Sequence, residues 1–451
     1  MSALPANWIT ARVEQLCQYN PKTEAGDDLT CGFAPMQSLG TTYRARLTFE
    51  NRQWGDVKKA YTHFKDRDVL VAKVTPCFEN GKAGIARDLP NGVGAGSSEY
   101  SVFRPCDGIV SEYLLGWFCT DSFRRRATIS MTGSVGLKRV PKEVFLSEEV
   151  WVAPTAEQVR IVKKLDTTLA RVDACRDRLA RVAPLIKRFR QVVLAAATSG
   201  RLTEGWGRVQ STSFPWTKTT IGELVEDLRY GTSKRCEAEA KGTAVLRIPN
   251  IGNSGSPDLL ELKYADFDHS EILKLSLKVN DLLVIRSNGS VDLVGRACVV
   301  DERAAGLLFA GYLIRLRVNQ KLVNPRFLYF AISSPEVRQF IEFTAKSTSG
   351  VNNINSEELR SITLQLPPLE EQLEIVRRVE TLFAYADRLE ARLKNAQAAA
   401  ERLTPALLAK AFRGELVPQD PNDEPAAELL KRLAAGREKA EVAKKRTAAK
   451  G

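Results

Sequence analysis

Residues 152–162 have the sequence VAPTAEQVRIV, and residues 366–376 have the sequence LPPLEEQLEIV. Five residues of the first stretch recur unchanged in the second: Pro154, Glu157, Gln158, Ile161 and Val162 correspond to Pro368, Glu371, Gln372, Ile375 and Val376. This constant offset of 214 residues (368 − 154) is called the repeat offset below. It holds without a gap to residue 202, and sixteen positions between 152 and 202 are identical to their counterparts. A match of this length indicates that one architectural unit is present twice. It predicts a pseudo-twofold molecule.

Each copy of the repeat predicts one long helix. The first follows Pro154, has no glycine between residues 155 and 198, and ends at Gly200, a residue type favoured just after a helix. Thr155 and Gln158 have the spacing of a capping box at its start. The second helix begins after Pro368 and ends at Gly414.

Both helices carry an apolar stripe with the a/d spacing of a coiled coil. Such a stripe needs a partner, and the simplest solution packs the two helices against each other in antiparallel orientation. The residues expected to form this coiled coil are Val162, Leu169, Leu179, Ile186, Val376, Phe383, Leu393 and Leu407.

The repeat divides the chain into alternating globular and helical parts. Short apolar runs between Gly, Pro and Asn predict strands, for example at 68–73 and 281–286, and residues 113–126 predict one amphipathic helix. The fold class is therefore α+β, with two globular domains joined by two long helices. The expected segments are 1–150 (first globular domain), 151–204 (first helical spacer), 205–365 (second globular domain), 366–416 (second helical spacer) and 417–451 (C-terminal tail).

Composition favours a polyanionic partner. The 451 residues carry a net charge of +12, which most simply suggests nucleic acid, although cationic side chains that only solvate long helices would give the same total. Part of the excess lies in the tail, where Lys444, Lys445, Arg446 and Lys450 could form a disordered, solubilising end.

The sequence predicts a cytoplasmic protein without a membrane association. No apolar run approaches the roughly 20 residues that cross a bilayer, and the first eight residues lack the features of a signal peptide. The eight cysteines are singletons without a CxxC pair, which favours reduced thiols and argues against a zinc site.

Polar loops in both globular domains are candidate DNA contacts. Small hydroxyl and glycine residues let a backbone approach phosphates, and Lys, Arg and Asn can reach phosphates or base edges. Ordinary polar turns remain the alternative for any single residue. The candidates are Lys73, Thr75, Thr132, Ser134, Lys138 and Arg139 in the first domain, and Arg286, Ser287, Asn288, Lys346, Thr348, Asn352 and Asn353 in the second.

Catalytic motifs are not found in the sequence. It contains no GxxxxGK[ST] phosphate loop and no Asn/Asp-Pro-Pro-Tyr/Phe signature of adenine methyltransferases. Residues 257–263 imitate the PD…ExK pattern of nucleases, but only two residues separate Asp258 from Glu261, whereas metal-binding carboxylates of that pattern come from different strands. We therefore expect no catalytic residue and no metal ligand in this chain.

The chain resembles the specificity subunits of type I restriction–modification systems over essentially its full length. The motifs that carry the resemblance are 281–286 (DLLVIR), 366–372 (LPPLEEQ), 411–416 (AFRGEL) and the proline-rich stretch 417–425. The first copy, at 152–158, is more degenerate.

The resemblance implies two target-recognition domains, each of which recognises one half of an asymmetric bipartite site in double-stranded DNA, and two helices that set the spacer between the half-sites. It also implies two methylation subunits and restriction (translocase/nuclease) subunits as partners. The methylation subunits are expected to dock on the helices, including the coiled-coil residues named above, and on the tail after Gly414. S-adenosylmethionine, ATP and Mg are expected on those partners, and no cofactor on this chain. Two other classes stay open: a stand-alone DNA methyltransferase or nuclease with unrecognised motifs, and a coiled-coil scaffold that does not bind DNA.

Overall fold

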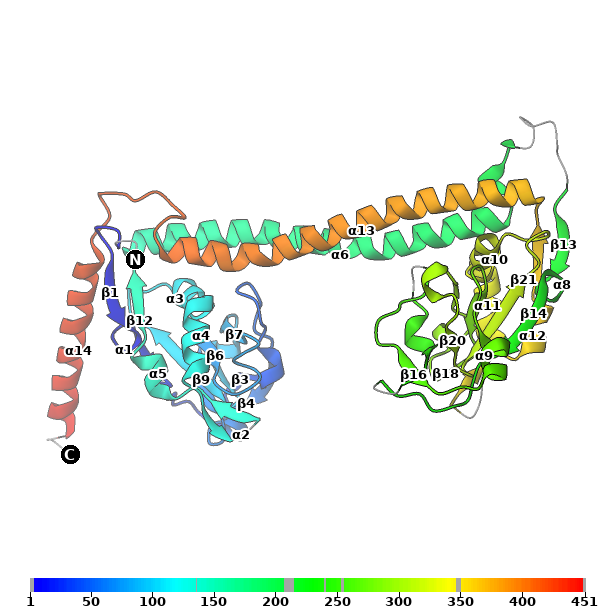
Figure 1. Cartoon of the computed structure of the whole chain (residues 1–451). Helices are drawn as coiled ribbons and strands as arrows, with labels where there is room; N and C mark the ends of the chain where they lie inside the picture. Colours follow the sequence, from blue (N-terminus) through cyan, green and yellow to red (C-terminus); the bar gives the residue numbers. More distant parts are fainter. Residues whose placement is uncertain are drawn as a thin grey trace. The chain divides into compact units, whose positions relative to one another are not determined.

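The computed structural model describes residues 4–134, 136–206, 215–238, 241–252, 255–345 and 350–448, with side chains as far as Lys439. The chain divides into two compact units (Figure 1): unit 1 is Met1–Ala180 with Asn395–Gly451, and unit 2 is Arg181–Lys394. Each unit holds part of both long helices. The globular part that precedes the first long helix is called head 1, and the globular part between the two long helices is called head 2.

The two long helices are α6 (Thr155–Thr198) and α13 (Leu369–Phe412), and each has 44 residues. α6 occupies the range that the sequence predicts. Gly200 and Gly414 follow the helices with left-handed φ angles of 78° and 72°, which end them.

The long helices pack in antiparallel orientation within each unit. In unit 1 the first turns of α6 share a core with the last turns of α13, for example through Leu165 and Phe412. In unit 2 the last turns of α6 share a core with the first turns of α13, for example through Val193 and Ile375. The predicted fold class, two α+β heads joined by two long antiparallel helices, is therefore confirmed.

The expected coiled-coil residues differ in burial. Leu169, Ile186 and Leu393 are buried. The partly buried members of the set are Val162, Leu179, Val376, Phe383 and Leu407. In α13 the fully buried positions include Ile375 and Val379, so the face that packs inward is centred slightly away from the predicted stripe.

Head 1 is built around two four-stranded sheets. The antiparallel sheet has the order β2 (Cys17–Tyr19), β9 (Tyr100–Pro105), β6 (Val69–Ala72), β7 (Ala83–Ile85). The mixed sheet has the order β4 (Glu50–Gln53), β3 (Thr30–Ala34), β8 (Val93–Gly96), β5 (Thr62–Lys65). Two strand pairs complete the head: β1 (Ile9–Arg12) with β12 (Glu149–Val152), and β10 (Thr132–Ser134) with β11 (Leu137–Arg139).

The helices of head 1 are α1 (Val13–Leu16), α2 (Trp54–Val57), α3 (Ser111–Phe118), α4 (Asp121–Ile129) and α5 (Lys142–Leu146), with 3-10 turns η1 (Met36–Ser38) and η2 (Pro90–Gly92). The single helix predicted over 113–126 is wrong, because α3 and α4 are separate. Thr120 breaks it by capping α4, where its hydroxyl accepts a 3.4 Å hydrogen bond from the Phe123 amide.

Head 2 repeats the antiparallel sheet of head 1 in the same strand order. Its strands are β14 (Val225–Tyr230), β21 (Leu313–Val318), β17 (Leu282–Ile285) and β19 (Ala297–Val299). The second sheet has the order β16 (Lys263–Ala265), β15 (Thr243–Leu246), β20 (Leu308–Phe309). The remaining pairs are β13 (Thr217–Thr220) with β23 (Thr363–Leu366), and β18 (Ser287–Asn288) with β22 (Asn352–Asn353).

The helices of head 2 show that the repeat extends further back than sequence identity indicates. They are α8 (Ile221–Leu224), α9 (His269–Leu275), α10 (Pro325–Ile332), α11 (Pro335–Thr344) and α12 (Ser356–Ser361), with 3-10 turns η4 (Ile248–Asn250), η5 (Val291–Leu293) and η6 (Glu302–Ala304); another, η3 (Arg201–Thr203), follows α6. The first residues of α10, α11, α12 and β23 lie at the repeat offset from those of α3, α4, α5 and β12. The offset of the long helices therefore also holds over the last part of each head.

A glutamine in the first turn of each long helix fastens the head to that helix. The Gln158 side chain accepts a hydrogen bond from the Val110 amide at 2.9 Å and donates one to the Ala153 carbonyl at 2.9 Å. Gln372 makes the equivalent contacts with the Asn324 amide at 2.7 Å and the Pro367 carbonyl at 2.9 Å. The predicted capping box is therefore wrong: Gln158 is used by the head.

The preceding glutamate adds a second fastening in each unit. Glu157 accepts a hydrogen bond from the Trp8 indole at 2.9 Å, and Glu371 accepts one from the Trp216 indole at 3.1 Å. Burial raises the pKa of Glu157, although hydrogen bonds from Trp8 and Gln419 oppose the shift. The repeated residues thus have a structural meaning: they join each head to its helix through the same contacts.

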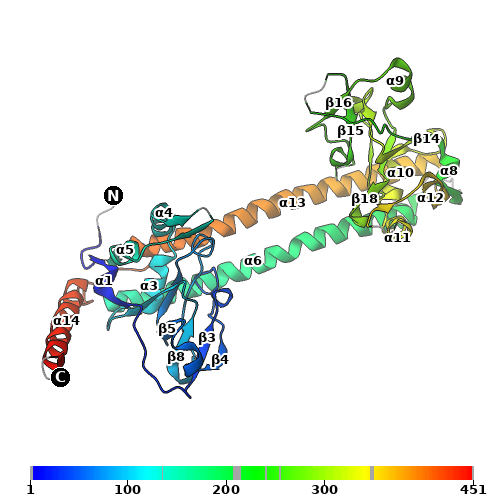
Figure 2. The same ribbon diagram turned by 90° about the horizontal axis from the view of Figure 1, so that it is seen from below.

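The C-terminal segment forms α14 (Ala426–Ala448), which Figure 2 shows alongside α1. Leu429 is buried in the core of unit 1, and the Ala426 amide donates to the Asn7 carbonyl at 3.0 Å. The disordered end suggested for Lys444, Lys445 and Arg446 is wrong, because these residues continue α14, while Lys450 lies outside the described residues. None of the helices in the described ranges combines the length and hydropathy that a membrane span requires.

We predict that Gln372→Leu destabilises the protein. Gln372 is fully buried, and leucine would leave the Asn324 amide and two carbonyls without their partner, at a cost of about 1–3 kcal/mol. Denaturant unfolding measures this change. The control is Gln365→Leu, an exposed position of β23, which should change the free energy of unfolding by less than about 0.5 kcal/mol. Equal effects of the two substitutions would contradict the fastening role.

Candidate nucleic-acid interface

In head 1 the structure brings together the two predicted DNA loops, which lie far apart in the sequence. The hairpin β10–β11 lies along the segment that leaves β6. The Thr75 amide donates to the Lys138 carbonyl at 2.9 Å, and the Thr75 hydroxyl accepts from the Lys138 amide at 2.9 Å. The Val140 amide donates to the Lys73 carbonyl at 2.8 Å. The hairpin is therefore held through its own backbone by the backbone of the β6 segment and by the Thr75 hydroxyl, and the residues of β10 and β11 are exposed.

The charged side chains of this loop pair divide into bound and free ones. Arg139 pairs with Glu99 at 2.7 Å, and this hydrogen bond holds the pKa of Glu99 below its usual value. Lys73 donates to the Ser98 carbonyl at 2.9 Å. Lys138 is exposed and has no side-chain partner among the described residues. Lys138 is thus the cation of this loop pair that is most available to a phosphate. Thr132 and Ser134 are also exposed on the same hairpin.

Head 2 contains the counterpart of this arrangement. β18, which follows β17, pairs with β22, so that Ser287 lies opposite Asn353 and Asn288 lies opposite Asn352. The Ile354 amide donates to the Arg286 carbonyl at 2.8 Å, which repeats the bond from Val140 to Lys73 in head 1. Lys346 and Thr348, the other two candidates, lie outside the described residues.

Arg286 is oriented by two neighbours. Its Nε donates to the Asn353 side-chain oxygen at 3.2 Å, and its guanidinium carbon lies 4.5 Å from the centre of the Tyr230 ring. A stacked arginine keeps most of its donors free in a fixed plane, which suits bidentate recognition of a guanine edge or a phosphate.

Arg286 also lines a cavity that the sequence did not predict. This cavity of about 720 Å³ is lined by the end of β14 with the segment after it, by Arg286 after β17, and by the segments that follow β15 and β20. Four basic residues and two tyrosines contribute to its wall: Lys234, Arg235, Arg247, Arg286, Tyr230 and Tyr312. The run Gly231-Thr232-Ser233-Lys234-Arg235 was the available sequence signal, since it combines small, hydroxyl and basic residues. Only the fold shows that Arg247 and Tyr312 join it.

A carboxylate at the start of one strand anchors each candidate loop. In head 1, Asp68 accepts two hydrogen bonds from Arg104, at 2.8 and 2.7 Å. In head 2, Asp281 accepts two from Arg317, also at 2.8 and 2.7 Å. Each carboxylate also accepts the amide three residues before it at 2.8 Å. The strands that lead to Lys73 and Arg286 are therefore fixed in the same way, with a buried carboxylate whose pKa in head 1 is raised by burial.

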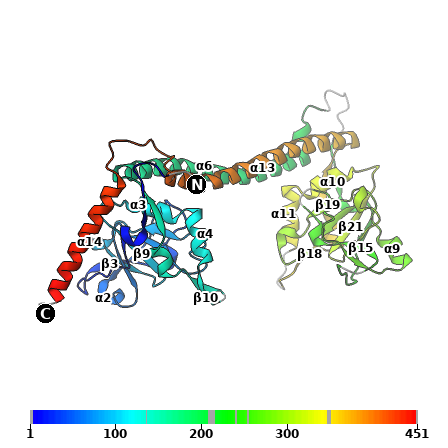
Figure 3. The same cartoon turned by 60° about the vertical axis from the view of Figure 1, so that its left-hand side comes forward.

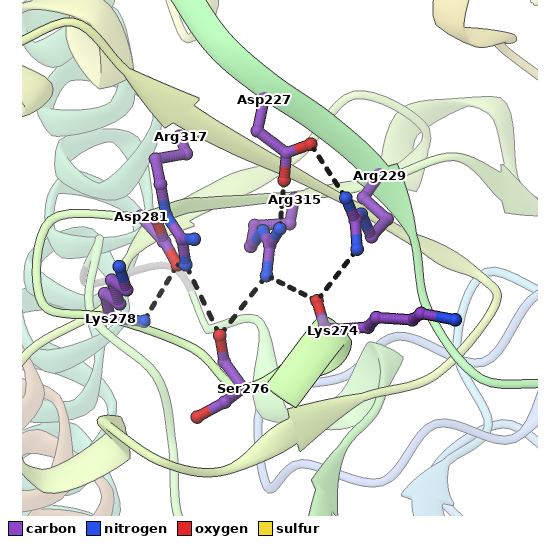
Figure 4. Close-up of polar contacts among 8 residues, drawn as sticks. All are labelled: Asp227, Arg229, Lys274, Ser276, Lys278, Asp281, Arg315 and Arg317. Carbon is purple, nitrogen blue, oxygen red and sulfur yellow. Dashed lines mark hydrogen bonds and ion pairs between the residues drawn. The ribbon is translucent and has the colours of Figure 1, made fainter. Parts of the chain in front are cut away.

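Head 2 adds a buried cation to this anchor. Figure 4 shows Arg315, only 1% exposed, between Asp227 and the carbonyls of Lys274 and Ser276, each 3.2 Å from its guanidinium. Burial lowers the pKa of Arg315. Burial alone would raise the pKa of Asp227, but the hydrogen bonds and charges of Arg315 and Arg229 together outweigh it and hold this pKa below its usual value.

Head 1 has no such cation at the equivalent place. Arg315 pairs with Leu283 across the sheet, and the corresponding partner of Leu70 in head 1 is Val102. The two heads therefore share a strand frame but differ in the side chain at this position of the sheet.

The apparent nuclease pattern has a local structural explanation. The Asp258 carboxylate accepts the Leu260 amide at 2.9 Å, and Glu261 has a left-handed φ of 55°. Both residues are exposed parts of a turn. Within the described ranges, no group of three or more His, Cys, Asp or Glu side chains is placed to hold a metal ion.

Comparison with known proteins gives the family. A family model described as the type I restriction modification DNA specificity domain matches residues 215–397. The specificity subunit of the type I restriction enzyme EcoKI from Escherichia coli (strain K12) is 34% identical over 345 residues, which cover 74% of this chain and 74% of that protein. The StySPI specificity subunit from Salmonella potsdam is 35% identical over 348 residues, which cover 74% and 73%. The chain belongs to the type I restriction enzyme specificity subunits.

Solved structures share the fold of this specificity subunit over most of its length. A chain from a study of complex assembly and conformational transition of the type I R-M system matches with a TM-score of 0.71 and 19% identity, covering 92% of this chain and 100% of that chain. The HsdS subunit from Thermoanaerobacter tengcongensis matches with a TM-score of 0.60 and 19% identity, covering 92% and 98%. At this identity the likeness concerns the fold alone.

We predict that Lys138 and Arg139 of this specificity subunit contribute differently to DNA binding. Lys138→Ala should make binding to random duplex DNA less sensitive to salt. The logarithm of the binding constant falls as the logarithm of the salt concentration rises, and the steepness of this fall should decrease by about 0.9, the value for one lost phosphate contact. Arg139→Ala should change the slope less, because its guanidinium is held by Glu99. Lys59→Ala, at an exposed position outside the hairpin, is the control. An equal decrease for Arg139→Ala would mean that the pair with Glu99 opens on DNA.

Proposed function

We propose that this chain is the DNA sequence-specificity subunit of a type I restriction–modification complex. It recognises an asymmetric bipartite site, with one half-site bound by each head and the spacer set by the two long helices. The observation that carries this proposal is the repeated loop pair. The same backbone bond, from Val140 to Lys73 and from Ile354 to Arg286, presents different side chains in the two heads.

The differences between the loop pairs support an asymmetric site. Arg139 of head 1 is replaced at the repeat offset by Asn353 in head 2, and Lys138 by Asn352. A lysine suits a phosphate or a guanine, whereas an asparagine amide suits an adenine edge. Two heads that share a backbone but not their exposed side chains would select different bases.

A repeated apolar position on the long helices supports two methylation subunits as partners. Val159 of α6 is 52% exposed, and Leu373, its counterpart in α13 at the repeat offset, is 53% exposed. Each lies two residues beyond the glutamate that fastens the head. An exposed large apolar side chain at the same place in both units would give two equal docking points, one for each methylation subunit.

The chemistry is assigned to the partners. The methylation subunits would hold S-adenosylmethionine, and the restriction subunits would hold ATP and Mg, while this chain is non-catalytic and binds no cofactor. The decisive experiment assembles the chain with methylation subunits and maps the modified sequences of a genome. A modified bipartite motif supports the proposal. Methylation or cleavage by the purified chain alone would favour a stand-alone enzyme, and an assembled complex without any sequence preference would favour a scaffold.

We predict that Arg286→Ala weakens recognition of one half-site only. Loss of one bidentate base contact costs about 1–3 kcal/mol and relaxes specificity at that base. Competition binding against duplexes mutated in either half-site measures the effect. Arg360→Ala, an exposed position of α12, is the control. Equal loss of affinity for every duplex would make Arg286 a phosphate contact instead.

We also predict that four residues inserted into α6 change the permitted spacer. Four helical residues add about 6 Å along the helix, which exceeds the rise of a base pair in DNA. The genome-wide methylation pattern of cells that carry the variant reports the new spacer length. The same half-sites with an unchanged spacer would show that the helices do not set it.

A further inference from the structure

Exposed large apolar side chains are rare in head 1. Within its described residues, the large hydrophobic side chains that are strongly exposed are Ile129, at 85%, and Leu137, at 47%. Single exposed apolar residues are common on soluble proteins and need no explanation. What requires an explanation here is that both positions recur in head 2.

The counterparts in head 2 lie at the repeat offset. They are Phe343, which is 79% exposed, and Val351, which is 53% exposed. The two heads differ in most of their side chains, and the residue types differ here as well. A large, exposed apolar residue is nevertheless present at both places in each head. Because the residue types differ, this indicates a shared function rather than a leftover of sequence identity.

The backbone places these residues beside the candidate DNA loops. Ile129 is the last residue of α4, and Leu137 begins β11 of the hairpin that carries Lys138. Figure 3 shows β10, the other strand of this hairpin, at the margin of unit 1. In head 2, Phe343 is close to the end of α11, and the Asn353 amide donates to the Ala345 carbonyl at 3.1 Å, which ties β22 to that helix end.

The charge of the surroundings favours nucleic acid over a protein partner in head 1. The stretch 121–142 contains six basic residues and one acidic residue, Asp121. The basic residues are Arg124, Arg125, Arg126, Lys138, Arg139 and Lys142, of which Arg126 and Arg139 are paired with Glu148 and Glu99. Such a segment attracts a polyanion. In head 2 the corresponding stretch 335–356 has two basic and two acidic residues, so the inference rests there on the exposed apolar side chains, to which Phe340 adds one that is 43% exposed.

We propose that Ile129 and Phe343 are wedges that press between adjacent base pairs of duplex DNA, one in each half-site. Large apolar side chains next to phosphate-binding loops can unstack a base step in this way. The inference rests on the proposed function and adds to it a mode of binding. Local unstacking at each half-site lowers the work that a methylation subunit must do to extrude its target base from the duplex.

The test uses the complete complex with methylation subunits and duplexes that carry 2-aminopurine at successive positions of each half-site. The base that a methylation subunit extrudes is left out of the series, because its own unstacking would brighten 2-aminopurine. At the remaining positions, binding of the unchanged complex should raise the fluorescence at one position in each half-site, because unstacked 2-aminopurine is brighter. Ile129→Ala should abolish the rise in one half-site and Phe343→Ala in the other. Each should weaken binding of its half-site about tenfold, the scale of one lost stacking contact.

Two controls separate a wedge from a structural role. Ile129→Leu and Phe343→Leu keep a large apolar tip and should retain the fluorescence rise, whereas Ile129→Ser should lose it. Leu273→Ala removes another exposed apolar residue of head 2, 69% exposed on α9, and should have no effect.

Each remaining outcome has one meaning. A complex that selects its bipartite site without any fluorescence rise would overturn the wedge and leave the proposed function intact. Loss of methylation subunits from the Ile129→Ala or Phe343→Ala complex, measured by its mass, would make these residues a protein contact and overturn the wedge too. A complex that shows no preference for any bipartite site would overturn the proposed function and the wedge together.

Discussion

The architecture depends on one buried glutamine in the first turn of each long helix. A buried amide is costly unless its donors and its acceptor are satisfied. Gln158 and Gln372 meet this condition by binding one amide of their head and the carbonyl that lies five residues before them in the chain. Because these contacts go to the backbone, the side chains of each head can change without loosening it. The repeat could thus stay identical at the fastening while the heads diverged.

Sequence alone was sufficient for the two long helices and insufficient for their contacts. The bounds of α6, the terminal glycines and the antiparallel pairing follow from spacing that depends on local geometry. Gln158 was misjudged as part of a capping box because its partner, Val110, lies 48 residues away in the chain. α14 was missed for a similar reason: its stability comes from Leu429 packing into unit 1, which composition does not reveal.

The candidate site shows the same division. Polar loops could be selected from the sequence, but the pairing of Thr75 with Lys138 depends on a long-range register that no local pattern contains. The sequence shows which residues are charged, but it does not show which of these charges are free to bind a partner. Arg139 and Lys138 look equivalent in the sequence, yet Arg139 is held by Glu99 and Lys138 is free among the described residues. Arg247 and Tyr312 were missed because the cavity that they share with Arg286 is formed by segments far apart in the chain.

The paired strand anchors explain how two unlike surfaces can stand on one frame. Asp68 with Arg104 and Asp281 with Arg317 hold the strands that lead to the loops, and both pairs use the same geometry. The layer beneath is then free to vary: Val102 in head 1 gives way to Arg315 with Asp227 in head 2. A buried ion pair gains little stability over an apolar contact, but it fixes orientation because either charge left alone would be costly. Head 2 therefore adds an ion pair beside the strand that leads to Arg286 where head 1 has an apolar residue, and the loops that follow these strands carry different side chains in the two heads.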